Sequence, residues 1–228
     1  MHLDELTRAL ADHGFDVVRA GPIGAYHAAV PAAFRLPFAD DRCIVLVGAS
    51  GAIWSHFRQA LAREPWRRQA DHPFDGWAAP LIDAAARALA AHAGCRVDVF
   101  HYQEPPPRRV ALQHLAEVLG VAGRAPCGLS IHPELGPWLS FRAAIVLDLP
   151  APALAPTPAW PCASCRDKPC LPPFERALAA TGHGSVQAHA ERWIAVRDAC
   201  PIGRPARYTD GQIRWHHAHD RQALEESG

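Results

Sequence analysis

Four cysteines in the C-terminal third of the chain have spacings typical of metal ligands. Cys162, Cys165 and Cys170 form a C-x2-C-x4-C group, and Cys200 follows about thirty residues later, next to Pro201. Two thiolates three residues apart can reach one metal centre, and a third and a remote fourth complete four-coordinate binding. A Cys-Pro pair is common as the distant ligand of iron–sulfur clusters. We therefore predict a metal site at these four cysteines, with a [4Fe-4S] cluster favoured over zinc.

Other interpretations of the cysteines remain open at this stage. Soft thiolate ligands in a four-coordinate arrangement suit Zn²⁺ as well, and the zinc would then form a structural site. A metal-free redox pair is a third reading, and small buried residues a fourth. The chain has seven cysteines, and an odd number in a reducing compartment argues against a disulfide framework. We interpret Cys43, Cys95 and Cys127 as packing residues.

A second cluster of chemically capable side chains lies in the segment from His132 to Trp138. His-Pro-Glu-Leu-Gly-Pro-Trp is a turn sequence that displays an imidazole, a carboxylate and an indole together. A neutral imidazole can bind a metal or donate a hydrogen bond, and an indole offers a flat face to a planar ligand. Spacing alone favours an ordinary turn whose histidine caps a backbone group.

Three further histidines cluster near the C-terminus, in Trp215-His216-His217-Ala218-His219. Three imidazoles so close together suggest a metal site, but their spacing also fits a solvated helix end. We expect the second, because this tail reads as exposed.

Composition limits the functions that these residues can serve. The 228 residues carry 23 basic and 23 acidic side chains, so no basic field exists to hold a nucleic acid. The longest apolar stretch, 143–150, is too short to span a bilayer, and the N-terminus is amphipathic. We therefore expect a cytoplasmic protein that binds neither nucleic acid nor membrane.

The elements that must position these residues alternate between helical and strand patterns. Residues 20–42 are expected to be irregular, and the turn 133–137 is expected to join two strands as an antiparallel hairpin. The mixture of helices with antiparallel pairing predicts an α+β sandwich. Helices are expected at 3–13, 53–61, 74–93, 110–119, 174–180 and 186–199, and strands at 15–18, 43–47, 96–102, 128–132 and 138–149.

Five prolines between Pro150 and Pro161 predict an extended connector rather than a helix or central strand. We place a boundary there. Residues 1–150 are predicted to form the main α+β domain. Residues 151–228 comprise the connector, a small cysteine-rich appendage and C-terminal helices that pack back on the domain.

Several segments together resemble the cblC-type family of cobalamin-processing proteins. These segments occur in family order across about residues 14–217, and their order and spacing make the match specific although no single piece is diagnostic. The matching segments are Gly14–Val17, Pro31–Pro37, Ile131–Trp138, Trp193–Ala199 and Arg207–Gln212.

The resemblance implies a flavin-reductase-like or nitroreductase-like α+β sandwich with a mainly antiparallel sheet that holds cobalamin base-off. It implies reductive removal of the upper axial ligand (decyanation or dealkylation) or trafficking of cobalamin. The electron donor would be a reduced flavin (FMN or FAD), ferredoxin or glutathione. His132 matches the histidine of the family's corrin site, and Gly136 and Trp138 match its companions. Arg197 and Arg207 would bind the nucleotide phosphate or glutathione carboxylates, or else form surface ion pairs.

The cysteine cluster departs from the animal members of that family. It is similar instead to cobalamin-dependent iron–sulfur reductases such as those acting on epoxyqueuosine, although their two complete cluster motifs are absent. The sequence therefore predicts a cobalamin-binding oxidoreductase, with no side chain assigned to catalysis and electrons from the cysteine-bound cluster or a flavin. Two alternatives remain: a non-catalytic cobalamin chaperone with a structural zinc site, and an iron–sulfur oxidoreductase acting on another substrate.

Overall fold

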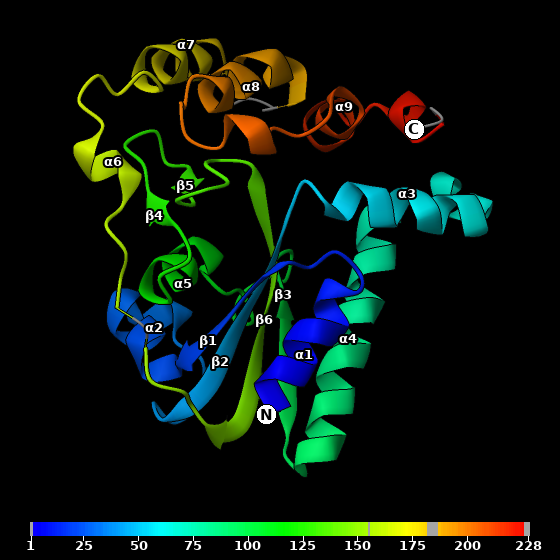
Figure 1. Ribbon diagram of the computed structural model, residues 1–228, viewed down its shortest axis with the longest axis vertical. Helices are drawn as coiled ribbons and strands as arrows, with labels where there is room; N and C mark the ends of the chain where they lie inside the picture. Colours follow the sequence, from blue (N-terminus) through cyan, green and yellow to red (C-terminus); the bar gives the residue numbers. More distant parts are fainter. Residues whose placement is uncertain (1, 155, 182–186, 226–228) are drawn as a thin grey trace.

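A four-stranded sheet forms the centre of the protein in a computed structural model that describes residues 2–154, 156–181 and 187–225 (Figure 1). The strand order is β1-β2-β6-β3, and each neighbouring pair is antiparallel. The α+β class and the antiparallel sheet predicted from the sequence are therefore confirmed, whereas the reductase-like sandwich remains a prediction. The strands are β1 (Val17–Pro22), β2 (Arg42–Ser50), β3 (Val97–His101) and β6 (Leu139–Pro150).

Strand β2 shows why helices cover both faces of this sheet. Its residues are apolar almost without interruption, as expected of a strand buried on both sides. Val45 and Val47 point into one core, and Ile44 and Leu46 point into the other. The first core is closed by α1 (His2–Ala11), α3 (Ile53–Arg63) and α4 (Pro73–Ala93), and the second by α2 (Ile23–Ala29) and α5 (Leu112–Val118).

The C-terminal helices form a layer across one end of the sheet (Figure 1). Arg58 of α3 donates to the Ala223 carbonyl, and Leu224 is fully buried in the first core, so the chain end is tied to the main body. The division into residues 1–150 and 151–228 stays a prediction. The elements of the layer are α6 (Pro161–Ser164), α7 (Leu171–Thr181), α8 (Ala190–Asp198) and α9 (Asp210–Ala218), with 3-10 turns at Gln187–His189, Arg204–Ala206 and Arg221–Leu224.

The expected hairpin between residues 128–132 and 138–149 is wrong. Strand β5 (Ser130–Ile131) pairs with β4 (Gly123–Arg124), whereas β6 pairs with β2 and β3. A tight turn explains the difference, because Ala125 N–H donates to the Leu129 carbonyl and so folds this segment back on itself. The turn after β5 is closed by the isolated bridge between His132 and Gly136 and not by strand pairing with β6.

The segment 20–42 is also more ordered than expected. Strand β1 runs on to Pro22, and α2 begins directly after it at Ile23. Additional 3-10 turns lie at Ala32–Phe34 and Pro65–Gln69. Across the described residues, no helix combines the length and apolarity needed to cross a membrane.

Candidate functional site

The turn that starts at His132 holds the imidazole in a defined orientation. Nδ1 accepts hydrogen bonds from the backbone N–H groups of Glu134 and Leu135, at 3.1 and 3.2 Å. Burial lowers the pKa of His132, so the ring is neutral at physiological pH. A neutral imidazole that accepts at Nδ1 carries its proton on Nε2. His132 therefore caps the turn, as its spacing suggested, and presents an Nε2–H donor.

His132 lies on a polar cavity of about 520 Å³. Arg19 contributes a positive charge to this cavity, and Asp16 and Glu134 contribute negative charges. A ligand bound here would meet hydrogen-bonding groups of both signs. The lining residues are Asp16, Val17, Val18, Arg19, Gly120, Val121, His132, Pro133, Glu134, Leu135 and Pro158.

Gly136 lets this turn pack directly on the loop that follows Cys200. Its φ is +58°, and a Cβ built on it would lie 2.1 Å from the Ile202 carbonyl oxygen. Gly203, at φ +73°, is similarly placed, with its Cβ position 2.1 Å from the Leu135 carbonyl oxygen. Such close approach of two backbones requires glycine on both sides. The His132 turn and the loop after α8 thus form one unit.

Trp138 is 1 % exposed, so its indole is not presented to a ligand in this structure. The Tyr208 ring packs against it at 5.3 Å, and the guanidinium groups of Arg197 and Arg207 lie 6.0 and 5.6 Å from its ring. The five residues predicted for cobalamin binding are therefore gathered in one region. Trp138 serves there as the core onto which the C-terminal layer packs.

The two arginines have protein partners in this region. Arg197 donates to the Pro137 carbonyl, which fixes the end of the His132 turn to α8. Arg207 pairs with Asp198 at 2.7 Å and with Asp210 at 3.0 Å, and hydrogen bonds to these two carboxylates raise its pKa. The ion-pair interpretation therefore describes Arg207 in this structure, while binding of a phosphate or carboxylate stays a prediction.

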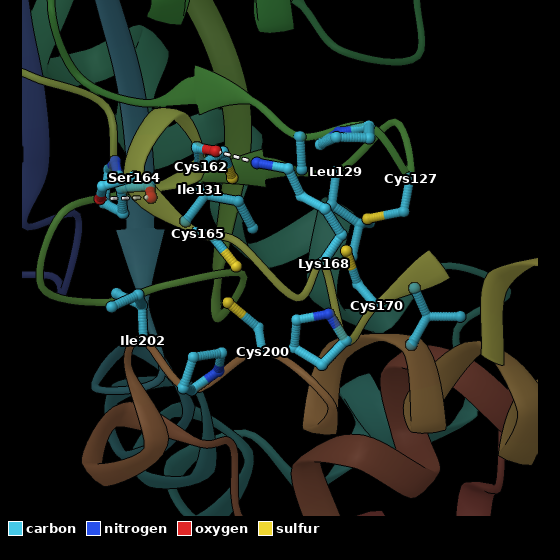
Figure 2. A pocket seen from close by; sticks show the side chains of 16 residues that line it. Cys127, Leu129, Ile131, Cys162, Ser164, Cys165, Lys168, Cys170, Cys200 and Ile202 are labelled. Carbon is cyan, nitrogen blue, oxygen red and sulfur yellow. Dashed lines mark hydrogen bonds between the residues drawn. The ribbon is translucent and has the colours of Figure 1, made fainter. Parts of the chain in front are cut away.

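The four predicted metal ligands line a second cavity, of about 190 Å³, together with a fifth cysteine, Cys127 (Figure 2). Helix ends place them. Cys162 lies in α6, Cys165 directly follows α6, Cys170 directly precedes α7, and Cys200 lies two residues after α8. The cysteine segment is fixed to the β4–β5 hairpin because the Trp160 ring covers Gly123, where a Cβ would lie 2.5 Å from it.

Cys127 is buried, as predicted for a packing residue, but its position at this cavity was not predicted. It follows the β4 strand more than thirty residues before Cys162, so its spacing carries no signal. The tight turn after β4 brings it there, next to Cys170. Burial and the neighbouring Cys127 raise the pKa of the Cys170 thiol.

Cys162, Cys165, Cys170 and Cys200 lie close enough for each to interact electrostatically with the other three. Cys127, by contrast, interacts with Cys170 among these four. Figure 2 shows the thiols of Cys165 and Cys200 pointing toward each other. Among the described residues, no three His, Cys, Asp or Glu side chains converge where a single metal ion would sit. The four sulfurs surround a space instead of meeting at one point.

Positive charges face the cysteine cavity. The ammonium of Lys168, the only lysine in the chain, donates to the Cys162 carbonyl and opposes the effect of burial on the Cys162 pKa. The charge of Arg204 likewise opposes the effect of burial on the pKa of Cys200, and the charge of Arg197 interacts with Cys127. No carboxylate is among the described residues that line this cavity.

Neighbouring residues of the chain line the two cavities. Ile131, at the end of β5, lines the cysteine cavity, whereas its neighbour His132 lines the polar cavity. Alternation along an extended backbone sends successive side chains to opposite sides. The segment from Ile131 to Leu135 thus contributes to the lining of both cavities.

A third cavity, of about 400 Å³, lies between α9 and the β3 edge of the sheet. His216 lines it, and its ring lies 5.3 to 5.9 Å from the rings of Phe74, Tyr208 and Trp54. Burial, followed by the Arg142 charge, lowers the pKa of His216 to about 3. The expectation of a solvated histidine tail is therefore wrong for His216, because α9 folds back over α3 and α4.

The architecture defines an α+β protein in which a C-terminal helical layer covers the end of an antiparallel sheet, with cavities between layer and sheet. No family model matches the chain, and no curated protein matches it. Among solved structures, the C. elegans B12-trafficking protein CblC, a homologue of human MMACHC, is similar, with a TM-score of 0.70 and 18 % identity over 98 % of this chain and 95 % of that one. The cblC-type resemblance predicted from the sequence is thereby confirmed for the fold.

Proposed function

We propose that this chain is a cobalamin-binding protein of the cblC type that traffics cobalamin or prepares it for use by removing its upper ligand. The observation that carries the proposal is the similarity to the C. elegans B12-trafficking protein, which spans nearly the whole of both chains. Fold alone does not define function. The His132 turn supplies the site, because the segment that carries the family resemblance lies on a cavity of about 520 Å³.

The chemistry of this cavity fits the polar periphery of a corrinoid. A corrin ring carries amide side chains and a nucleotide phosphate, all of which need hydrogen-bond partners once water is excluded. Arg19 and the Nε2–H of His132 are donors for such groups. A whole corrinoid is larger than this cavity, so the rest of the ring would extend beyond it.

The state of His132 supports base-off binding in which the imidazole is not a cobalt ligand. Coordination through Nε2 needs a lone pair on that nitrogen, but Nδ1 already uses its own lone pair to accept from Glu134 and Leu135. His132 would therefore orient the corrinoid by donation and leave the lower face of cobalt without a protein nitrogen. A Co(III) centre without a nitrogen ligand on its lower face would be easier to reduce.

Removal of cyanide requires one electron from an external reduced flavin, ferredoxin or glutathione. Cobalt changes from Co(III) to Co(II), and cyanide leaves with both electrons of its bond. The part played by this chain is to bind the corrinoid, orient it and exclude water.

The proposal is tested by titrating the purified protein with cyanocobalamin and recording the visible spectrum. We expect saturable binding and a shift of the cobalamin bands to the base-off form. Parallel titrations of His132→Ala and His216→Phe locate the ligand, because these residues line different cavities. Binding without later decyanation under reducing conditions would identify a carrier. No spectral shift at any protein concentration would overturn the proposal.

A further inference from the structure

The cysteine cavity has features that the binding of cobalamin does not explain. Five of the chain's seven cysteines line it, although they come from the turn after β4, from α6 and the residue after it, and from the segments before α7 and after α8. Apart from Lys168 and Ser164, the other side chains of its lining are apolar. Simple packing would not bring so many thiols to the wall of one open space.

The arrangement of the thiols distinguishes between kinds of metal site. A structural zinc site needs four sulfurs at about 2.3 Å from one ion, which brings them close together. Within the described residues no such convergence occurs. A cubane cluster carries its irons at separate corners, so its four thiolates stand apart around it. The mutual proximity of Cys162, Cys165, Cys170 and Cys200 around a cavity of about 190 Å³ matches the second arrangement.

The surrounding charges point to an anionic occupant. A [4Fe-4S] cluster held by four thiolates carries net negative charge in its usual oxidation states. Lys168, Arg204 and Arg197 each interact with a cysteine of this cavity, and no carboxylate is found among its described lining residues. The backbone of Ile202 also hydrogen-bonds the Cys200 side chain. Hydrogen bonds and charges of this kind stabilise clusters and tune their potentials.

We infer that Cys162, Cys165, Cys170 and Cys200 hold a [4Fe-4S] cluster that passes single electrons to a corrinoid in the cavity at His132. The second half of this inference rests on the proposed function. Ile131 lines the cysteine cavity, its neighbour His132 lines the polar cavity, and Ile202 packs against Gly136 beside them. This adjacency favours transfer between the two occupants.

The electron balance is simple. A one-electron donor of the ferredoxin or reduced-flavin class reduces the cluster. The cluster would pass that electron to Co(III), which becomes Co(II), and cyanide leaves as an anion with the bonding pair. The cluster ends in its oxidised state, ready for another electron.

The metal site is tested on the full chain, purified anaerobically and reconstituted with ferrous iron and sulfide. We expect about four irons and four sulfides per chain and a broad absorbance that bleaches on reduction. Cys165→Ser should lose at least half of this iron. The control Cys95→Ser should retain it, because Cys95 packs against the first core and does not line the cavity. One zinc per chain without sulfide, or an intact disulfide without metal, would overturn the assignment.

Electron transfer is tested separately. The reduced protein is freed of excess reductant by desalting and mixed with cyanocobalamin, and we expect one Co(II) per reduced cluster. Cys165→Ser should still bind cobalamin at saturating concentration and yield no Co(II). A loaded, reduced cluster that leaves bound cobalamin as Co(III) would overturn the relay. Absence of cobalamin binding, with the cluster present, would contradict the proposed function while leaving the metal site intact.

Discussion

Gly136 and Gly203 hold two backbones against each other. A Cβ on either glycine would lie 2.1 Å from a carbonyl oxygen of the opposite segment, Ile202 or Leu135. Through this contact the loop that follows Cys200 fixes the position of the turn that begins at His132. The predicted corrinoid site and the predicted metal site therefore depend on the same packing.

Replacing Gly136 by alanine should destabilise the fold strongly. The added Cβ meets backbone that cannot rotate away, and φ +58° is itself unfavourable for alanine. We expect a loss of about 3 kcal/mol or more in the free energy of unfolding. Chemical denaturation checks this, with Gly94→Ala as matched control, because Gly94 has φ +61° but open space around it. Equal losses in the two variants would show that backbone conformation, and not contact with Ile202, determines the cost.

His132→Asn should separate the two roles of the imidazole. The asparagine carbonyl can accept the backbone hydrogen bonds that Nδ1 accepts, but no donor remains at the place of Nε2. We expect unchanged thermal stability and a cobalamin affinity about 5- to 10-fold weaker, as for the loss of one neutral hydrogen bond. His132→Ala should lose both thermal stability and cobalamin affinity, because alanine neither caps the turn nor supplies a donor. Full affinity in the asparagine variant would remove the Nε2 donor from the site.

The spectrum of bound Co(II)-cobalamin should show no protein nitrogen on cobalt. Nδ1 of His132 is occupied by the N–H groups of Glu134 and Leu135, so Nε2 keeps its proton. Electron paramagnetic resonance reports a coordinated nitrogen as superhyperfine splitting. We expect its absence in the wild-type complex. Splitting that disappears in His132→Ala would prove that the imidazole reorients and ligates cobalt.

Stability should fall on acidification because of His216. Burial first, then the charge of Arg142, lowers its folded pKa to about 3, whereas the unfolded value is about 6.5. Between these two pKa values the unfolded state therefore binds more protons than the folded state. The contribution of His216 to stability rises with pH through this window and is constant above it. The other groups acting on His216 in the same direction are His217, Arg197 and His219.

Urea denaturation between pH 4 and 8 measures this effect. His216→Phe should reduce the slope below about pH 6.5 by the contribution of one proton, at most about 1.4 kcal/mol per pH unit. A smaller slope should remain, because burial also lowers the pKa of His217, to about 4. His13→Gln, at an exposed position, is the control and should follow the wild type. A wild-type curve already flat across this range would contradict the burial of His216.

Cys127 should not be a cluster ligand, although it lines the cavity. It lies beside Cys170 and not among the four cysteines that all interact with one another. We expect Cys127→Ser to retain its full iron content after reconstitution and Cys170→Ser to lose at least half. Iron analysis of both variants checks this. Loss of iron in Cys127→Ser with full iron in Cys170→Ser would show that Cys127, and not Cys170, is the ligand.

Local patterns in the sequence predicted most elements well. The buried run at 43–47, the helix 74–93 and the long strand at 138–149 all appear, with small differences at their ends. Each has a strong apolar period that burial imposes. The strand pairing after residue 128 could not be predicted in this way, because a turn closed by Ala125 and Leu129 determines it. The apolar pattern of residues 128–132 is compatible with pairing to β4 and with pairing to the strand at 138–149.

The site could be predicted where the spacing of residues in the sequence indicates their proximity. It could not be predicted where tertiary packing brings distant residues together. Cys162, Cys165 and Cys170 are close in sequence, so their proximity follows from short loops. Cys127 reaches them only through the β4–β5 hairpin. His216 reads as solvated because the aromatic rings around it come from α3, α4 and the segment before α9.

The segment from Ile131 to Leu135 contributes to the lining of both cavities, so a change in it can couple binding at the two places. A binding event that moves or stiffens this segment changes the free energy of binding in the opposite cavity, and the coupling is reciprocal. If metal loading of the cysteines tightens corrinoid binding tenfold, corrinoid must tighten metal retention tenfold. The protein would then favour the doubly loaded and the empty forms over either singly loaded one, which makes metal loading a checkpoint for cobalamin uptake.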